Sequence, residues 1–375
     1  LYTYRGFSRR IVVEFNIAVL GGDGIGPEVT NESVKVLNAV SKAFGHTFNL
    51  TYGDVGGISI DKHGTPLLDE VRELAGSSDA VLFGAVGGPK WDDPTANMRP
   101  EDGLLQLRAE MGVFANIRPV KVYPNLIESS VLKPEVLEGV DMVVVRELTG
   151  GLYYGEPKGR NETANGWTSV DTMFYTEAEI ERVLRVGFEL AQGRRGKLAS
   201  IDKANVLECS RLWRHIATNL APEYPNVELE HVLVDACAMQ LVQDPRRFDV
   251  IVAENTFGDI LTDEAAVLAA SMGLLPSASL SDVPIAGRKI SGFYEPIHGT
   301  APDIAGKGIA NPIGSILSTA LMLRYSLGMT EEATSVEKAV ESVLNNGSRT
   351  PDIISEGGEK TSTTDMGDKI AQAIG

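Results

Sequence analysis

Short apolar runs alternate with amphipathic stretches along the whole chain, and this alternation predicts strands and helices in turn. NIAVL at 16–20 has the composition of a buried strand, and apolar residues then recur at helical spacing from Pro27 to Phe44, where Gly45 follows. Proline suits the first turn of a helix, and glycine suits the position after its last turn. The pattern therefore predicts a strand, a tight turn and a helix that ends at Gly45.

Five further apolar runs predict strands of the same kind. They are AVLFGAV (80–86), VDMVVVR (140–146), KLASID (197–202), VELEHVLVD (227–235) and FDVIVAEN (248–255). Several are apolar enough to be buried on both faces, as the strands of parallel sheets are. Strands that alternate with helices in this way indicate the α/β class.

The stretch at 151–176 departs from this alternation. It is rich in glycine, asparagine, threonine and aromatic residues, and it lacks helical spacing. It therefore predicts an extended arm or a hairpin. Because so many aromatic side chains are unfavourable in water, we expect the arm to pack on a partner subunit.

Length, charge and cysteine content narrow the class of protein. A chain of 375 residues suggests two domains, and a net charge of -17 argues against nucleic acid or an anionic membrane as the main partner. No apolar stretch approaches the roughly 20 residues that span a bilayer. Two cysteines, Cys209 and Cys237, make no disulfide framework, so a reducing compartment such as the cytoplasm is expected.

The first fifteen residues, LYTYRGFSRRIVVEF, carry Arg5, Arg9 and Arg10 before the first acidic residue. One interpretation is the remnant of a targeting segment, which would place the protein in an organelle matrix or stroma. The segment is short and aromatic, which favours the other interpretation, an additional tail on a cytoplasmic protein.

The glycine-rich segment GGDGIGPE at 21–28 looks like a dinucleotide-binding turn. Gly22, Gly24 and Gly26 do not give the spacing Gly-x-Gly-x-x-Gly, however. The spacing instead favours a tight strand-to-helix turn that needs positive φ. A nicotinamide cofactor, if there is one, is expected to bind elsewhere.

Asp259 and Asp263 are the first candidates for a metal site. They stand at i and i+4, so on a helix their Cβ atoms lie about 5–6 Å apart on one face. Oxygen ligands alone suit Mg²⁺ or Mn²⁺. The alternative is a pair of solvated acids near a helix N-terminus. Asp235, which ends the apolar run at 227–235, is either a further ligand or a helix cap.

The segment RPEDGLLQLR at 99–108 predicts a helix with an unusual face. That face carries Glu101, Leu104, Leu105 and Arg108. With Arg118 and Arg146, in predicted strand-end or loop positions, Arg108 could bind two carboxylates in bidentate fashion. Taken singly, each arginine could instead be an ordinary surface or ion-pair residue.

Two more residues are candidates for proton transfer. Lys203 follows the predicted strand at 197–202, where a desolvated lysine can act as a general base. Tyr153 is a candidate proton donor. The alternatives are a surface lysine and a tyrosine that only packs in the arm, as Tyr154 could equally do.

The long loop EPIHGTAPDIAGKGIANP at 295–312 is rich in glycine and proline, and loops of this length are usually functional. Asp303 could accept hydrogen bonds from both ribose hydroxyls of an adenosine and would repel a 2′-phosphate, which favours NAD over NADP. His298 could cover the adenine. The alternative is a surface loop.

Together these segments resemble the β-decarboxylating dehydrogenases, a family that acts on 3-isopropylmalate, isocitrate and related acids. The similarity runs from about residue 15 to the C-terminus. It is carried by GGDGIGPEV, GAVGGPKWD (84–92), RPEDGLLQLR, FANIRPVKVYP (114–124), VVRELTGGLYYGEPKG (144–159), DKANVLE (202–208), NTFGDILTDEA (255–265), GLLPSASL (273–280) and HGTAPDIAGKGIANP (298–312).

The resemblance implies a fold other than the ordinary Rossmann fold, with a large mixed sheet flanked by helices. One domain would comprise 1–113 and 268–375, and an inserted domain at 114–267 would carry the arm and the dimer contacts. The tail at 1–15 has no counterpart in the family, and 281–294 is longer than in many relatives.

The resemblance also implies roles for individual residues. Asp235, Asp259 and Asp263 would bind Mg²⁺ or Mn²⁺, Lys203 would be the base and Tyr153 the acid. The substrate would contact Arg108, Arg118, Arg146, Asp235, Glu101, Leu104 and Leu105. NAD would contact Gly87, Gly88, Pro89, His298, Gly299, Thr300, Ala301, Asp303, Ile304 and Asn311. Lys203 and Asp235 would reach the active site of the other subunit of a homodimer.

Leu104 and Leu105 bear on the choice of substrate, because a carboxylate against two leucines would be unpaired at a cost of several kcal/mol. They favour the isopropyl group of 3-isopropylmalate, whose oxidation and decarboxylation give 4-methyl-2-oxopentanoate, a leucine precursor. The alternatives are D-malate, isocitrate or homoisocitrate, a non-catalytic regulatory subunit, and a plain nucleotide-binding module.

Overall fold

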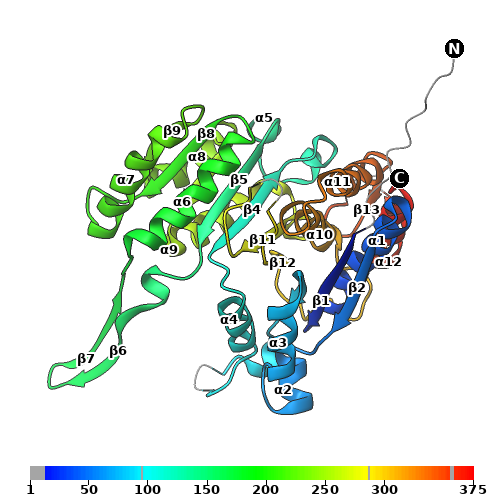
Figure 1. Ribbon diagram of the computed structural model, residues 1–375, viewed down its shortest axis with the longest axis horizontal. Helices are drawn as coiled ribbons and strands as arrows, with labels where there is room; N and C mark the ends of the chain where they lie inside the picture. Colours follow the sequence, from blue (N-terminus) through cyan, green and yellow to red (C-terminus); the bar gives the residue numbers. More distant parts are fainter. Residues whose placement is uncertain (1–12, 94–95, 286–287, 355–358) are drawn as a thin grey trace.

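The computed structural model describes residues 13–93, 96–285, 288–354 and 359–375. Ten strands of this part of the chain form one sheet in the order β2-β1-β3-β12-β11-β4-β5-β10-β8-β9 (Figure 1). Their bounds are β1 Glu14–Gly22, β2 Thr47–Tyr52, β3 Ala80–Ala85, β4 Ala115–Lys121, β5 Asp141–Glu147, β8 Lys197–Asp202, β9 Glu228–Leu233, β10 Val250–Ala253, β11 Pro276–Leu280 and β12 Gly292–Pro296. Short strands β13 (Ser348–Arg349) and β14 (Glu359–Lys360) pair separately.

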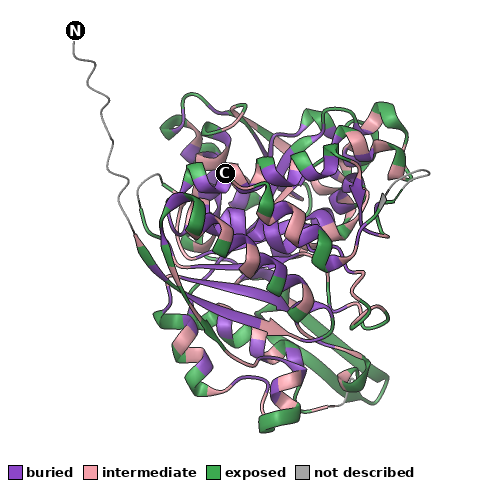
Figure 2. Cartoon of the chain, turned by 90° about the vertical axis from the view of Figure 1, so that its right-hand side faces the viewer, coloured by how far each residue is buried: buried purple, intermediate pink, exposed green. Residues whose placement is uncertain are grey.

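Helices pack on both faces of this sheet, and Figure 2 shows its strands buried between them. Their bounds are α1 Gly26–Phe44, α2 Gly57–His63, α3 Asp69–Ser77, α4 Pro100–Glu110, α5 Pro134–Leu137, α6 Glu177–Gln192, α7 Glu208–Leu220, α8 Val234–Gln243, α9 Asn255–Ala266, α10 Ile313–Tyr325, α11 Thr330–Asn345 and α12 Thr363–Gln372. The expected α/β class with a large mixed sheet is confirmed.

The sheet consists of two parallel blocks that run in opposite directions. β2, β1, β3 and β12 are parallel to one another, and so are β5, β10, β8 and β9. Between the blocks, β11 is antiparallel to β12 and to β4, and β4 is antiparallel to β5. The apolar runs at 80–86 and 140–146 could not reveal this reversal, because a buried strand has the same composition in either direction.

One face of the sheet is covered continuously, and the other is not. A single apolar cluster on the first face joins α1, α10 and α6 to both blocks of strands. On the second face, α8 and α9 pack on one block, whereas α3 and α4 pack on the other. Between these two apolar clusters, the strands in the middle of the sheet carry polar side chains on this face, among them the buried Asn116 and Ser279.

The predicted strands are all present, but two of them end earlier than predicted, where a helix begins: β10 ends at Ala253 and Asn255 begins α9. β9 ends at Leu233, and Asp235 lies in the first turn of α8 rather than at the end of a strand. An acidic side chain in the first turn interacts favourably with the helix dipole, which suits Asp235 there. Arg118 is also misplaced by the prediction, because it lies inside β4 and not at a strand end or in a loop.

The glycine turn at 21–26 is a tight strand-to-helix turn, as the failed fingerprint spacing predicts. Gly22 and Gly24 have φ values of 69° and 58°. A Cβ on Gly22 would collide with the carbonyl of Ala85, and one on Gly24 would collide with the carbonyl of Thr300. The turn thus lets β1 pack directly against β3 and against the loop that follows β12.

The stretch at 151–176 contains a hairpin, as predicted. β6 (Gly155–Thr163) and β7 (Gly166–Thr172) pair antiparallel and project from the rest of the molecule (Figure 1). Trp167 at its tip is 69% exposed. Packing of the arm on a partner subunit stays a prediction.

The proposed domain division falls where β11 pairs with β4, and the sheet is continuous across it. The division into 1–113 with 268–375 and 114–267 stays a proposal. Arg5, Arg9 and Arg10 lie outside the described residues. Cys209 and Cys237 are free thiols, and within the described residues every helix is too short or too polar to cross a membrane.

Replacing Gly22 by alanine should destabilise the fold far more than the same change at Gly45. Both glycines have positive φ, but nothing lies within 4 Å of a Cβ on Gly45. Gly45→Ala should therefore lower the free energy of unfolding only by the strain of a left-handed backbone at alanine, about 1–2 kcal/mol. Gly22→Ala adds the collision with Ala85 and should lower the thermal midpoint several times as much. Equal shifts for the two variants would contradict this account of the turn.

Candidate active site

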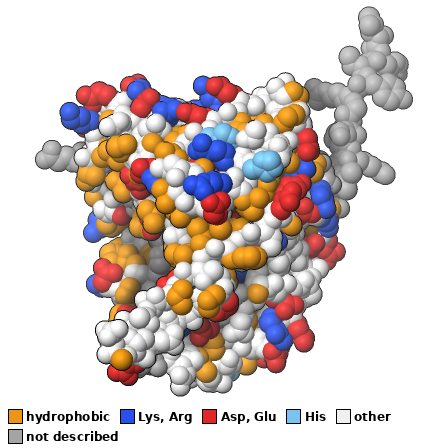
Figure 3. Space-filling model, turned by 90° about the vertical axis from the view of Figure 1, so that its left-hand side faces the viewer, with side chains coloured by type: hydrophobic (Ala, Val, Ile, Leu, Met, Phe, Trp, Pro, Cys, Tyr) orange, Lys and Arg blue, Asp and Glu red, His pale blue; other side chains and the backbone are white. Residues whose placement is uncertain are grey.

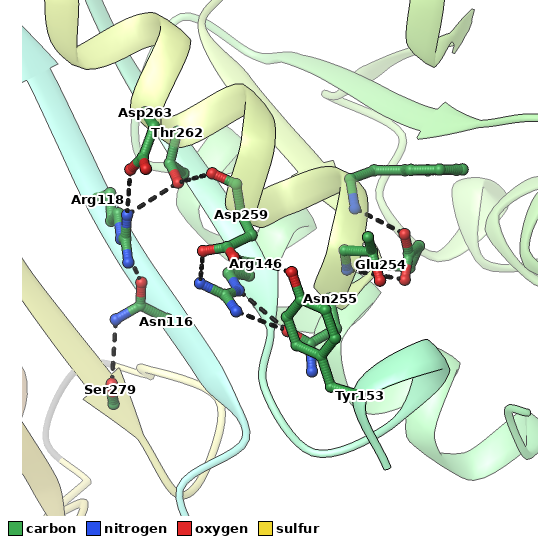
Figure 4. A network of polar contacts seen from close by, with 12 residues as sticks. Asn116, Arg118, Arg146, Tyr153, Glu254, Asn255, Asp259, Thr262, Asp263 and Ser279 are labelled. Atoms are coloured by element: carbon green, nitrogen blue, oxygen red, sulfur yellow. Dashed lines mark hydrogen bonds and ion pairs between the residues drawn. The ribbon is translucent and has the colours of Figure 1, made fainter. Parts of the chain in front are cut away.

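A row of polar side chains crosses the middle of the sheet between the two apolar clusters of its second face. Asn116 on β4 lies opposite Arg146 on β5 and opposite Ser279 on β11, so all three point to the same face. Asn116 Nδ2 donates to Ser279 Oγ at 3.0 Å. Arg118, two residues along β4, continues the row (Figure 4). Isoleucine at 117, between them, points to the apolar core of the other face.

Arg146 is the most constrained cation of this row. Its Nε and Nη2 donate to Asn255 Oδ1 at 3.1 Å and 2.9 Å, and its Nη1 donates to Asp259 (Figure 4). Gly258 approaches so closely that a Cβ there would lie 2.8 Å from Arg146 Cγ. The first turn of α9 therefore packs directly on the guanidinium and fixes its orientation.

Arg118 is held from its own strand and from α9. Its Nε donates to Asn116 Oδ1 at 2.8 Å, and its Nη1 donates to Thr262 Oγ1 at 2.9 Å and lies 3.4 Å from Asp263 Oδ1. Burial lowers the pKa of Arg118, and the neighbouring Arg146 lowers it further. Burial also lowers the pKa of Arg146, against the opposing effect of Asp259. These are partly desolvated cations, which favour an anion between them.

α4 brings Arg108 to the same region. Arg108 Nη2 donates to Glu295 Oε1 at 2.7 Å, whereas its Nε is buried and has no partner among the described residues. Leu104 is half-buried and Leu105 is 44% exposed, so both are free to contact a ligand. The positive charge of Arg108 adds to burial in lowering the pKa of Arg146.

Asp259 and Asp263 lie on one face of α9, as their spacing predicts. Asp259 pairs with Arg146 and accepts a hydrogen bond from Tyr153, and Asp263 is 68% exposed. Both offer oxygen atoms alone, which fits Mg²⁺ or Mn²⁺. Among the residues that the structure describes, no three acidic, histidine or cysteine side chains are arranged to hold a metal ion. A third protein ligand, where a metal ion needs one, would come from outside this group of side chains.

Tyr153 lies in the short 3-10 helix η3 (Gly151–Tyr153) that precedes the hairpin. Its hydroxyl donates to Asp259 Oδ2 at 2.9 Å. Burial and this hydrogen bond raise the pKa of Tyr153, so the phenol stays protonated. Tyr154, the alternative candidate, has a side chain that makes no hydrogen bond to these groups among the described residues.

Lys203 and Asp235 form a separate pair. Lys203 Nζ lies 2.8 Å from Asp235 Oδ2, and this contact lowers the pKa of Asp235. Lys203 directly follows β8, as predicted, and Asp235 begins α8 beside it. The structure brings these two residues together but does not bring either to Asp259 within the chain.

The loop after β12 packs on the glycine turn. The Ile25 amide donates to the Thr300 carbonyl at 2.9 Å, and Ala301 has a φ of 39°. Ala301, Ile304 and Ala305 pack against the start of α1. Asp303 is exposed at the surface of this turn, where a ribose could reach it.

His298 and Asn311 are fixed at the two ends of that loop. His298 Nδ1 lies 2.9 Å from the Gly299 carbonyl, and its Nε2 is buried without a partner among the described residues. Burial lowers the pKa of His298, so the ring is neutral and Nε2 is an acceptor. Asn311 Nδ2 donates to Asp352 Oδ2 at 3.0 Å.

A second glycine segment lies between the glycine turn at 21–26 and α4. Gly87 donates to Asp23 Oδ2 at 2.9 Å and has a φ of 112°. A Cβ on Gly87 would lie 2.8 Å from Glu101 Oε1. Gly88 and Pro89 continue toward the short turn at 89–91. An open backbone here, together with the unpaired Nε2 of His298, fits a nucleotide that follows the main chain.

Several positioning residues escaped the sequence analysis. They are Asn116, Asn255 and Thr262, which orient Arg118 and Arg146, and Glu295, which holds Arg108. Asn255 stands four residues before Asp259 on the same helical face, and Asn116 stands two before Arg118 on the same strand face. These spacings place each asparagine beside a candidate site residue, and they are the sequence signal that could have identified both asparagines.

Comparisons with known proteins identify the family of the chain. A family model described as isocitrate/isopropylmalate dehydrogenase matches residues 16–370. The 3-isopropylmalate dehydrogenase of Dehalococcoides mccartyi (strain CBDB1) is 56% identical over 364 residues, which cover 97% of this chain and 100% of that protein.

Solved structures are similar over the same span. The crystal structure of isocitrate dehydrogenase from Methylococcus capsulatus has a TM-score of 0.81 and 33% identity, with 96% of this chain and 99% of that one covered. A β-decarboxylating dehydrogenase from Thermococcus kodakarensis has a TM-score of 0.76 and 36% identity, with 96% of each chain covered.

Replacing Asp259 or Asp263 by asparagine should weaken Mn²⁺ binding by about tenfold or more, because a carboxylate ligand to a hard cation is lost. Free Mn²⁺ can be counted by electron paramagnetic resonance during a titration. Asp244→Asn is the matched control, since Asp244 is an exposed acid paired with Arg246 at 3.6 Å. Wild-type Mn²⁺ affinity in both the Asp259 and the Asp263 variant would show that the metal does not bind at this helix.

Proposed function

The chain belongs to the isocitrate/isopropylmalate dehydrogenase family, and from this premise we propose that it oxidises and decarboxylates 3-isopropylmalate in leucine biosynthesis. The observation that carries the choice of substrate is the face of α4. Its half-buried and exposed leucines, Leu104 and Leu105, stand beside Arg108 and suit a branched aliphatic group next to a carboxylate. The product would be 4-methyl-2-oxopentanoate.

Enzymes of this family generally use NAD and a divalent metal, and the residues of this chain fit both. Asp259 and Asp263, with Asp235 of the partner subunit, would hold Mg²⁺ or Mn²⁺. NAD would lie along the loops of Gly87 and Thr300, with its adenosine at Asp303 and Ile304. When bound, NAD accepts a hydride from C2 and the metal withdraws electron density from the C2 oxygen.

The side chains of the chain supply binding and proton transfer. The two carboxylates of the substrate would be bound by Arg108, Arg118 and Arg146. Burial already lowers the pKa values of Arg118 and Arg146. Lys203 of the partner subunit would take the proton of the C2 hydroxyl. After CO₂ leaves C3, Tyr153 would donate its proton to that carbon. Its hydrogen bond to Asp259 keeps it protonated until then.

Assembly as a homodimer is part of this proposal, and an apolar surface supports it. Val206 follows Lys203, Met239 is on α8 after Asp235, and Ile260 lies between the two acids of α9. Their exposed fractions are 61%, 58% and 63%. Figure 3 shows hydrophobic side chains spread over the face that carries the hairpin. Large exposed apolar areas of this kind mark protein interfaces.

The rival class, a non-catalytic regulatory subunit, is less well supported. Such a chain would be expected to lack a metal carboxylate or the base, whereas Asp235, Asp259, Asp263 and Lys203 are all present. The nearer rivals are the same reaction on D-malate, isocitrate or homoisocitrate. These acids differ from 3-isopropylmalate in the substituent that would contact α4.

Purified protein should form NADH from 3-isopropylmalate with a kcat/KM about 100-fold or more above that for isocitrate, because a third carboxylate would be unpaired against the leucines. EDTA should abolish the activity, and NADP⁺ should be a poor substitute for NAD⁺. Leu104→Ala should lower kcat/KM for 3-isopropylmalate about tenfold, yet leave D-malate, which lacks the isopropyl group, within about twofold. A preference for isocitrate would sink the proposed substrate.

Mixing two inactive variants should restore activity if Lys203 acts in the partner's site. Lys203→Met and Asp259→Asn homodimers should each be nearly inactive. After subunit exchange about half of the dimers are mixed, and each has one intact site, so activity should recover to about a quarter of wild type. No recovery, with exchange verified by mass spectrometry, would place Lys203 in its own subunit's site.

A further inference from the structure

A buried cluster of two glutamates and a tyrosine lies behind the active site. Glu147, Glu254 and Tyr175 are 0%, 3% and 6% exposed. The Tyr175 hydroxyl lies 3.2 Å from Glu147 Oε2 and 3.3 Å from Glu254 Oε2, and it accepts the Asn255 amide at 3.0 Å. Its single proton is therefore shared between two carboxylates, which would otherwise face each other without a donor between them.

The two glutamates reach different parts of the site. Glu147 accepts the amides of Thr149 and Gly150, both at 2.8 Å. Glu254 caps α9 by accepting the amides of the residues at 256 and 257. Tyr175 thus joins the loop that leads to Tyr153 with the start of the helix that bears Asp259.

The ring of Tyr175 sets the path of that loop. A Cβ on Gly150 would lie 2.5 Å from Tyr175 Cε1, and one on Gly151 would lie 2.5 Å from its hydroxyl oxygen. Asn255 Nδ2 adds a hydrogen bond to the Gly150 carbonyl at 3.1 Å. Tyr153 follows two residues later in η3. The proton transfers described above do not themselves use Tyr175 or Glu147.

We propose that Tyr175 is a positioning residue that acts through Tyr153: its hydroxyl holds the 149–151 loop against the start of α9 and so sets the 2.9 Å contact between Tyr153 and Asp259. The inference rests on the proposed function, because Tyr153 is the proton donor only there. Burial and the two glutamates raise the pKa of Tyr175, which keeps its hydroxyl a donor.

The test is Tyr175→Phe, which keeps the ring and removes the hydroxyl. In the full-length enzyme, kcat for 3-isopropylmalate should fall about tenfold while KM stays within about twofold, because a proton donor is misplaced and substrate binding is not. In a Tyr153→Phe background, Tyr175→Phe should have no further effect on kcat, because the effects of two residues that act through the same proton transfer are not additive.

Tyr294→Phe is the matched control. Tyr294 is fully buried, and its hydroxyl has a 2.6 Å hydrogen bond to Ser326 on the other side of the sheet from the site. This variant should be destabilised to a similar extent and keep wild-type kcat. If Tyr175→Phe does not fold, Glu147→Gln disrupts the same link from its other end with almost no change of shape.

A second readout does not depend on turnover. Hydrogen exchange of amides 148–155, without substrate, should be faster in Tyr175→Phe and unchanged in Tyr294→Phe. Unchanged exchange in Tyr175→Phe would overturn the proposal, and so would an equal fall in kcat with and without Tyr153. If wild type does not act on 3-isopropylmalate but the exchange result holds, the proposed function fails and the structural link remains.

Discussion

The site depends on the hydrogen bonds and the ion pair of the half-buried Arg146 guanidinium. A partly desolvated cation is costly unless acceptors surround it, and here Asn255 and Asp259 provide them from the first turns of α9. This requirement fixes where α9 packs on the sheet. Asp259 then brings Tyr153 to the same point through its second carboxylate oxygen. One set of contacts thus positions the candidate substrate-binding arginine, the candidate metal ligand Asp259 and the candidate acid Tyr153.

Space for that set comes from the reversal in the middle of the sheet. Because β11 and β4 run antiparallel between two opposed parallel blocks, α4 and α9 approach one face from different sides and do not meet over it. The strand alternation there places Asn116 and Arg118 on the face between α4 and α9 and isoleucine 117 in the apolar core of the other face. Arg118 and Arg146, the candidate substrate-binding arginines on this face, therefore stand on strands of the sheet itself.

Much of this was predictable from the sequence, and the exceptions have physical causes. Helix α1 with its Gly45 cap and the face shared by Asp259 and Asp263 follow from local periodicity, and the hairpin follows from its composition and its lack of helical spacing. The reversal at β11 and β4 does not, because strand direction leaves no mark in a buried run. Asp235 was assigned to a strand because its run stays apolar into the first turn of α8. Asn255 was missed because a polar helix residue shows its role only beside its partner.

If the site takes a divalent metal ion and a dianionic substrate, its charges favour binding of the two together. Without ligands, Arg108, Arg118 and Arg146 each face one carboxylate, from Glu295, Asp263 and Asp259. A dianionic acid alone would have to displace these carboxylates from the arginines, and a divalent cation alone would draw Asp259 and Asp263 away from Arg146 and Arg118. A divalent cation on Asp259 and Asp263 together with a dianionic acid on the arginines would add no net charge. Each ligand thus removes the electrostatic cost of the other, which is a positive coupling between their affinities.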